Sequence, residues 1–392
     1  MKDIQNGFVD YFDIGEMLTE EQLIIRESVR KFVERKLMPV IDDAAQTHNP
    51  PDFLNKDLAE YGAFGCFIPE KYGGAGLDYI SYGLMAYELE RGDSAVRSAV
   101  SVQSSLVMYP IYTFGNEKQR KEFLPKLASG EMIGAFGLTE PNHGSDPGAM
   151  ETKIIDKGSY YLLNGSKAWI TNSPICDLAV VWAKDENGIV RGLIVERNFD
   201  GFTTATTEKK WSLRASHTGE MFFKNVKVPK ENMLPNVQGL KGPLMCLNSA
   251  RYGIAWGVLG AAENCLQTAL NYSLERHQFS KSIASFQLTQ KKLAEMLTEL
   301  TKGQLMAWRL GKLKDAGKVR PEQISMAKRS NVETALKIAR ESRQILGAMG
   351  ISGDFPVMRH MMNLESVITY EGTHDIHLLI TGADITGISA FY

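Results

Sequence analysis

The residues best suited to chemistry lie near the end of the chain, in the stretch TYEGTHDIHLL from Thr369 to Leu379. A carboxylate at Glu371 precedes His374 and His377, which are three residues apart and flank a second carboxylate. Imidazole and carboxylate groups are common zinc ligands, so the spacing allows a metal site. It equally allows a proton-transfer site at Glu371. No third ligand is spaced to join the two histidines, which weighs against a metal site.

The same stretch also fits an ordinary helix start. Gly372 is suited to a turn, Thr373 to an N-cap, and Asp375 to the first helical turn. Glu371 then precedes the cap on an irregular segment, where a side chain can be aimed into a cleft. Glu371 is therefore the one side chain of this stretch that the helix start does not explain; the metal, proton-transfer and helix-start interpretations stay open at this point, and we assign no role to the histidines.

Two stretches in the middle of the chain are candidates for ligand contacts. In FGLTEPNHGSD, Phe136 to Asp146, backbone N–H groups and hydroxyls could face a ligand, although a turn-rich connection is equally compatible with this composition. In KAWITN, Trp169 and Thr171 are expected on one side of a strand, where they could wall a flat aromatic cofactor. The alternative for Trp169 is packing in a β core, which is the more common situation for a tryptophan.

Two arginines are candidates for substrate contacts. Arg97 and Ser98 follow Glu90 where one helix is expected to end and the next to begin. Arg97 could hold a substrate carboxylate through two parallel hydrogen bonds, or it could form a surface salt bridge of little energetic value. Arg251 is expected to open a long helix, where the helix dipole disfavours a cation, so a ligand or carboxylate partner is indicated.

Composition excludes several classes of protein. The chain has 392 residues, 44% of them hydrophobic, and a formal net charge of −2. A core of this size favours more than one domain, and the charge argues against a dedicated nucleic-acid binder. The four cysteines are far apart and form no C-x-x-C pair, so we expect buried, reduced thiols. The phosphate-loop, dinucleotide-binding and G-x-S-x-G signatures are absent.

Three zones follow one another along the chain. Residues 1–132 show helical spacing, with a capping-box pattern at Thr19 and Gln22. Residues 133–238 read as short strands separated by turn signals, which favours an antiparallel sandwich or barrel; these signals are Asn164-Gly165, Glu186-Asn187-Gly188 and Asp200-Gly201. Residues 239–392 read as long amphipathic helices in a four-helix-type bundle. The predicted fold is therefore mainly α with a small central β domain.

The beginning of the chain resembles neither a signal peptide nor an Arg-rich transit peptide. No apolar run approaches the roughly 18 residues that a membrane span requires. We expect a soluble, cytoplasmic protein without membrane insertion, or one of the mitochondrial matrix if a transit segment has been removed.

The ordered set of stretches PEKYGGAG, LTEPNHGSD, NGSKAWITN, RQILGAMGI and YEGTHDIH resembles the acyl-CoA dehydrogenase family of flavoproteins over nearly the whole chain. Further stretches, YELERGDSAVRSAVSVQSSLV, WSLRASHTGE, SARYGIAWGVLGAAE and MNLESVITYEGTHDIH, resemble the branch that acts on glutaryl-CoA. The resemblance implies the same order of domains, FAD as the cofactor, a homotetramer, and electron transfer to an electron-transferring flavoprotein. It also implies a place in the breakdown of amino acids such as lysine and tryptophan.

Site residues follow from the resemblance, position by position. Glu371 matches the catalytic base. The implied substrate contacts are Glu90, Arg97, Ser98, Ser145, Leu244, Arg251 and Tyr370. The implied flavin contacts are Phe136, Leu138, Thr139, Ser145, Trp169, Ile170, Thr171, Thr373, Asp375 and Phe391. The implied contacts with the FAD of a neighbouring subunit are Arg276, Phe279, Gln287, Gln344, Gly347 and Ala348. The family commonly has a second glycine at the position of Ala348, so this chain places one extra methyl group there.

The activity implied by the resemblance is oxidative decarboxylation of glutaryl-CoA to crotonyl-CoA and CO2. Glu371 would remove the α proton, a hydride would pass to N5 of the flavin, and glutaconyl-CoA would then lose CO2. Three alternatives stay open. The first is dehydrogenation that stops at glutaconyl-CoA, the second is activity on another short acyl-CoA, and the third is a non-catalytic helical binding protein.

Overall fold

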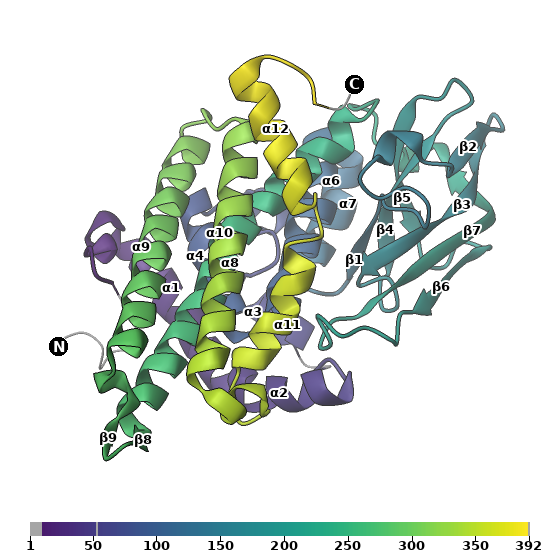
Figure 1. Cartoon of the computed structure of the whole chain (residues 1–392). Coiled ribbons are helices and arrows are strands. Elements are labelled where there is room, and N and C mark those ends of the chain that lie inside the picture. The colour runs from purple at the N-terminus through teal and green to yellow at the C-terminus, as the bar shows by residue number, and fades with distance from the viewer. Residues whose placement is uncertain (1–9, 52–53, 391–392) are drawn as a thin grey trace.

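The computed structural model describes residues 10–51 and 54–390. A helical body occupies one side of the molecule and a β sheet the other (Figure 1). The prediction of helices, then a small β domain, then helices again is confirmed. The described helices include none long and apolar enough to cross a membrane.

The N-terminal helices begin and end where their capping residues require. The predicted capping box is present, because the Gln22 amide donates to the Thr19 hydroxyl at 3.2 Å and the Gln22 side chain accepts from the Thr19 amide at 3.0 Å. Two short π-helical segments, Val33–Leu37 and Val102–Met108, interrupt this region. The α-helices are α1 (Glu20–Phe32), α2 (Met38–Thr47), α3 (Leu54–Glu60), α4 (Tyr79–Gly92), α5 (Ser94–Ser101), α6 (Tyr109–Phe114) and α7 (Glu117–Ala128).

The central region forms one curled seven-stranded sheet. Its path runs β1-β4-β2-β3-β7-β6, and β5 pairs with β4. The prediction of an antiparallel arrangement is wrong for β1, which pairs in parallel with β4, and for the single pair between β2 and β4. The strands are β1 (Gly134–Gly137), β2 (Lys153–Asp156), β3 (Tyr160–Thr171), β4 (Leu178–Lys184), β5 (Val190–Glu196), β6 (Phe202–Thr206) and β7 (Thr218–Pro229).

One of the three predicted turns of the sheet is wrong. Asn164 and Gly165 lie inside β3, where the register with β7 shifts between Leu163 and Gly165. Gly165 has φ +145°, and a Cβ there would lie 2.4 Å from the hydroxyl of Thr152. The glycine therefore serves a bulge and a close approach rather than a hairpin. Turns do occur at the other two predicted places, 186–188 and 200–201.

The C-terminal region is a bundle of long helices. It contains α8 (Lys241–Glu275), α9 (Gln287–Asp315), α10 (Pro321–Ile345), α11 (Val357–Val367) and α12 (His374–Thr386), with a small hairpin of β8 (His277–Gln278) and β9 (Lys281–Ser282). The hairpin lies at the end of the bundle away from the sheet, whereas α11 and α12 run along the side facing it (Figure 1). All four cysteines are buried and unbridged, as predicted.

The prediction that Arg251 opens a helix is wrong. Helix α8 begins ten residues earlier, at Lys241, because Gly242 and Pro243 fall in its first turn, where proline is tolerated. Arg251 therefore lies in the helix interior, and its hydrogen-bond partner is the Glu371 carbonyl in the turn before α12.

Candidate active site

The turn between α11 and α12 places Glu371 as the helix-start pattern predicts. Thr373 is the N-cap of α12, and its hydroxyl accepts from the Ile376 amide at 3.3 Å. Gly372 has φ +95° and Glu371 has φ +54°, a left-handed conformation that is uncommon outside glycine. Two consecutive residues in this conformation turn the chain sharply before the cap, so Glu371 leaves the regular structure.

The carboxyl group of Glu371 is prepared to accept a proton. Its Oε2 atom is buried and has no hydrogen-bond partner among the described residues. Burial raises the pKa of Glu371, and the cations Arg97, Arg251 and Lys328 act against that rise. A carboxylate with a raised pKa is a stronger base than a solvated one, which suits proton abstraction.

Arg97 does not form the surface salt bridge that we considered, because it is buried. Its Nε atom donates to Oε2 of Glu90 at 2.5 Å, and both side chains are almost fully enclosed. Its Nη2 group donates to the hydroxyl of Tyr370, the residue before the candidate base. The Nη1 atom has no partner among the described residues, so this edge of the guanidinium can still donate to an acceptor.

The residues around Arg97 explain how the buried Arg97–Glu90 pair fits between the helices. Asp93 caps α5 by accepting from the Ala95 amide at 2.7 Å, and Arg359 and Asn363 from α11 donate to the same carboxylate. Across from it, a Cβ at Gly257 of α8 would lie 2.2 Å from Oε2 of Glu90. Only glycine at this position allows the buried pair to approach α8.

Arg251 and a lysine that the sequence did not single out contact the same turn. The Nε of Arg251 donates to the Glu371 carbonyl at 2.7 Å. Lys328, from α10, donates to the carbonyls of Tyr370 at 3.1 Å and Gly372 at 3.0 Å. A lysine inside an amphipathic helix carries no sequence signal for such a role, because only the fold brings α10 against this turn.

The two histidines of the opening motif are not arranged as a metal site. The described residues include no group of three or more His, Cys, Asp or Glu side chains placed to hold a metal ion. His377 is buried beside Gly372, and burial lowers its pKa to about 3, so it stays neutral. His374 begins α12 and donates its amide to the Ile368 carbonyl at 3.1 Å.

The predicted flavin contacts of the β domain divide by burial. Trp169 is 67% exposed with φ +60°, at a register shift of β3, so the β-core alternative is wrong. Ser145 is also exposed, and Thr139 and Thr171 are half-buried. Phe136, Leu138 and Ile170 have buried side chains that pack in the cores. The side chains that a flat ligand can reach are therefore those of Trp169, Ser145, Thr139 and Thr171.

A second buried lysine holds the loop after β1. Lys167 of β3 donates to the Leu138 carbonyl at 3.0 Å and to the Glu140 carboxylate at 2.9 Å. The Ala168 amide donates to the Thr139 carbonyl at 2.9 Å. The loop is thus fastened to the strand segment that carries Trp169, and its polar groups are fixed in place.

The remaining predicted residues lie elsewhere. Leu244 is partly exposed in the first turns of α8, Ser98 is buried beside Arg97, and Asp375 is exposed in the first turn of α12. Phe391 lies outside the described residues. The predicted contacts with a neighbouring subunit's cofactor are all exposed and belong to the hairpin end of the bundle and the end of α10; they are Arg276, Phe279, Gln287, Gln344, Gly347 and Ala348.

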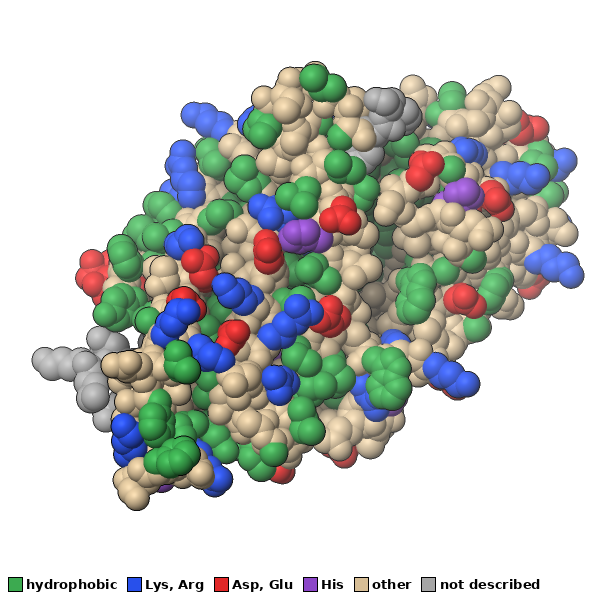
Figure 2. Space-filling view, in the orientation of Figure 1, with side chains coloured by type: hydrophobic (Ala, Val, Ile, Leu, Met, Phe, Trp, Pro, Cys, Tyr) green, Lys and Arg blue, Asp and Glu red, His purple; other side chains and the backbone are tan. Residues whose placement is uncertain are grey.

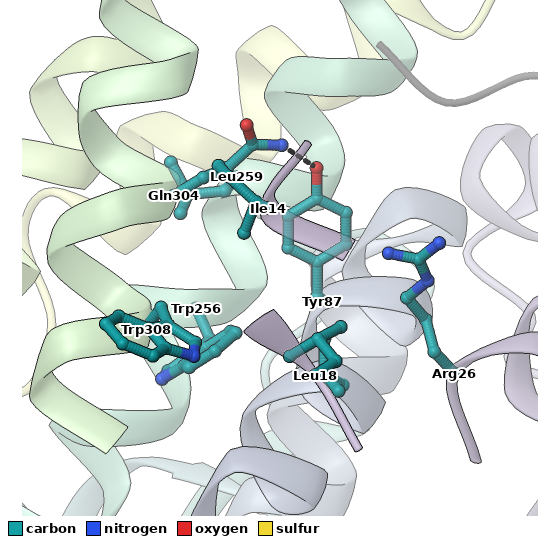
Figure 3. Close-up of a pocket in the computed structure, with 9 residues that line it drawn as sticks. Ile14, Leu18, Arg26, Tyr87, Trp256, Leu259, Gln304 and Trp308 are labelled. Carbon is teal, nitrogen blue, oxygen red and sulfur yellow. Dashed lines mark hydrogen bonds between the residues drawn. The ribbon is translucent and has the colours of Figure 1, made fainter. Parts of the chain in front are cut away.

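The base turn and the sheet belong to the two parts that border a recess. The surface is hollowed between the helical body and the sheet, on the side along which α11 and α12 run (Figure 2). A separate cavity of about 30 Å³ lies among α4, α8, α9 and the N-terminal segment, and Tyr87 and Gln304 are hydrogen-bonded in its wall (Figure 3). No predicted site residue lines that cavity, so the recess is the candidate location of the active site.

An exposed, rigidly presented tryptophan beside a fastened polar loop suits a flat cofactor, and a buried unpaired carboxylate suits proton abstraction. Comparisons with known proteins agree. The acyl-CoA dehydrogenase N-terminal, middle and C-terminal domain models match residues 19–131, 135–226 and 238–386. The chain belongs to the acyl-CoA dehydrogenase family. It is an FAD-dependent enzyme that acts on an acyl-CoA ester.

Three relatives are similar to this chain over most of its length. A glutaryl-CoA dehydrogenase of Mycobacterium smegmatis, solved in complex with FADH2, is 46% identical, with 98% of this chain and 99% of that chain covered and a TM-score of 0.96. Glutaryl-CoA dehydrogenase of Desulfococcus multivorans is 38% identical over 95% of this chain and 98% of its own length. The mitochondrial short-chain specific acyl-CoA dehydrogenase of Rattus norvegicus is 34% identical over 93% of this chain and 89% of its own length.

Proposed function

We propose that this enzyme oxidises glutaryl-CoA and releases CO2, giving crotonyl-CoA. One observation carries the choice of substrate. Arg97 is buried, is held by Glu90 and Tyr370, and keeps an unpartnered Nη1 next to the residue that precedes the candidate base. A buried guanidinium with an unpartnered N–H donor favours an acyl chain that ends in a carboxylate, because a buried donor left without an acceptor is costly.

The chain's own residues account for the first step. Glu371 removes the proton α to the thioester carbonyl, and burial raises its pKa for that task. The amide of Glu371 donates to no backbone carbonyl among the described residues, so it is available to the thioester oxygen as charge develops. Bound FAD supplies the acceptor for the hydride that leaves the β carbon. Loss of the proton and the hydride leaves a double bond between the α and β carbons.

Decarboxylation makes a second demand on the site. Arg97 would hold the distal carboxylate during oxidation and must release it for CO2 to leave. Glu90 bonded to Nε provides an alternative partner that keeps the guanidinium charge compensated when the carboxylate is lost. Protonation of the resulting dienolate then yields crotonyl-CoA.

The family resemblance supports two further proposals. The electrons pass to an electron-transferring flavoprotein. The chain forms a homotetramer, in which the exposed residues at the hairpin end of the bundle and the end of α10 bind the FAD of a neighbouring subunit.

An acyl-CoA panel with a dye acceptor tests the substrate. We expect fast reduction with glutaryl-CoA, slower reduction with butyryl-CoA, and one CO2 per glutaryl-CoA oxidised. Arg97→Met should lower kcat/KM for glutaryl-CoA by on the order of 10²-fold and leave butyryl-CoA within a few-fold, since a charged hydrogen bond contributes roughly 2–3 kcal/mol. Equal losses on both esters would remove Arg97 from this role. Oxidation without CO2 would instead identify an enzyme that stops at glutaconyl-CoA.

A further inference from the structure

Lys328 is a buried amine that the proposed reaction does not use. It lies on α10 and is 1% exposed. Its two hydrogen bonds go to the Tyr370 carbonyl at 3.1 Å and the Gly372 carbonyl at 3.0 Å, the groups on either side of Glu371. Among the described residues its hydrogen bonds go to backbone carbonyls and to no carboxylate.

The turn that Lys328 contacts needs to be held. Glu371 and Gly372 both have positive φ, and the left-handed conformation is unfavourable for a residue other than glycine. Such backbone persists only where the surroundings determine it. Here three successive carbonyls, at positions 370, 371 and 372, accept hydrogen bonds from Lys328, Arg251 and Lys328 in turn.

The arrangement leaves the Glu371 carboxylate free. Arg251 and Lys328 donate these hydrogen bonds to backbone oxygens. Oε2 of Glu371 has no partner among the described residues. Burial lowers the pKa of Lys328 to about 7, opposed by Glu371 and reinforced by Arg251 and Arg97. A neutral amine still has two N–H groups, so both hydrogen bonds survive loss of the charge.

We propose that Lys328 is a positioning residue, which clamps the turn Tyr370–Gly372 so that the carboxylate of Glu371 is presented to the acyl chain. The proposal rests on the proposed function for its effect on the reaction, since Lys328 acts through Glu371 and touches no reacting atom. The clamp itself is a property of the backbone and can be tested without turnover.

The rate test uses Lys328→Met, which keeps an unbranched side chain of nearly the same length and removes the amine that makes both hydrogen bonds. We expect flavin reduction by the acyl-CoA substrate to slow by on the order of 10²-fold, the cost of misplacing a catalytic group by about 1 Å. Substrate affinity, measured with and without Lys328→Met in a Glu371→Gln background that cannot turn over, should change less than about threefold. Lys328→Gln, which restores a neutral N–H donor, should recover part of the rate.

Lys337→Met is the matched control, because Lys337 is exposed on the same helix. Hydrogen exchange of the backbone amides from 370 to 376 gives the second readout. We expect it to accelerate in Lys328→Met, less in Lys328→Gln, and not in Lys337→Met. If Lys328→Met does not fold, Lys328→Gln is compared with the wild type by the same two measurements.

Unchanged exchange together with a reduction rate within threefold of the wild type would overturn the proposal. A slowed reaction with unchanged exchange would also overturn it, because the clamp would then not be the cause. If none of the acyl-CoA esters reduces the flavin of the wild-type enzyme, the proposed function fails. The exchange measurement still decides whether Lys328 holds the turn.

Discussion

Two buried lysines border the candidate site, and their surroundings differ. Lys167 holds the loop after β1 and is neutralised by Glu140, whose carboxylate also accepts the amides of Glu151 at 2.6 Å and Thr152 at 3.0 Å. Lys328 holds the turn that carries Glu371 and bonds only to carbonyl oxygens. Both amines are buried, and burial lowers the pKa of Lys167 to about 8 and of Lys328 to about 7.

The difference follows from what each region must leave free. The loop after β1 has only to be held, so its lysine has a carboxylate partner, and the pKa of Glu140 falls to about 2. The turn after α11 carries the base, and a direct salt bridge from Lys328 to Glu371 would lower the basicity that proton abstraction requires. A lysine bonded to the backbone holds the turn without occupying the carboxylate.

The largest effect is expected from replacing the proposed base, Glu371. Glu371→Gln should retain FAD and bind acyl-CoA, while flavin reduction falls by at least 10²–10⁴-fold, the usual contribution of a general base. Stopped-flow absorbance of the flavin measures the rate, and the cofactor content is the control. Rapid bleaching of the flavin in this variant would show that Glu371 is not the base.

The next largest effect is expected at Lys167, the buried lysine paired with Glu140. Lys167→Met leaves the buried Glu140 without its cation, and breaking such a pair typically costs about 3–5 kcal/mol. Because two backbone amides still compensate Glu140, we expect about 3 kcal/mol, measured by urea unfolding, together with weaker FAD retention. Lys153→Met, at an exposed lysine on neighbouring β2, is the control. A loss below about 1 kcal/mol would contradict the structural role given to this pair.

The pH dependence of stability distinguishes the two amines further. An unfolded lysine titrates near pH 10.4, so above pH 7 the unfolded chain binds more protons at Lys328 than the folded chain does. The contribution of Lys328 to stability therefore rises with pH between about 7 and 10, by at most ~1.4 kcal/mol per pH unit. Relative to Lys328→Met, the wild type should gain unfolding free energy as pH rises above about 7, and relative to Lys167→Met it should do so above about pH 8. Parallel curves would show that burial does not perturb these amines.

The smallest effect tests the backbone of the base turn. Gly372 and Gly62 both have positive φ, but a Cβ at Gly372 would lie 2.9 Å from the His377 ring, whereas nothing lies within 4 Å at Gly62. Gly62→Ala should cost about 1 kcal/mol and Gly372→Ala about 2 kcal/mol. Only Gly372→Ala should also slow flavin reduction. Equal effects on stability and rate would mean that the turn is not tightly held.

Local signals in the sequence correctly predicted the backbone of the turn that carries Glu371. Gly372 and Thr373 predict a turn and an N-cap, which depend on few neighbours, and the structure confirms both. Other local signals failed because distant contacts override them. The Asn164-Gly165 pair was interpreted as a turn, yet it lies in a strand because Thr152 packs against Gly165.

Burial was the property that sequence patterns predicted least well. Arg97 could have been exposed and Trp169 could have been buried, and the structure shows the reverse in both cases. A charged residue between two helices or a tryptophan in a strand has no fixed depth. Its depth depends on which other elements pack on it, here Gly257 of α8 against the Arg97–Glu90 pair.

The sequence by itself determined the order of the regions, the capped turn that frees Glu371, and the family. These features depend on hydrophobic periodicity, on capping chemistry and on motifs that are contiguous in the chain. Tertiary structure alone decided that Lys328 and Arg251 hold three successive carbonyls and that Arg97 keeps one free nitrogen beside Tyr370. The reason is that these contacts join residues 42 to 273 positions apart, and their distances follow from the packing of helices rather than from any local pattern.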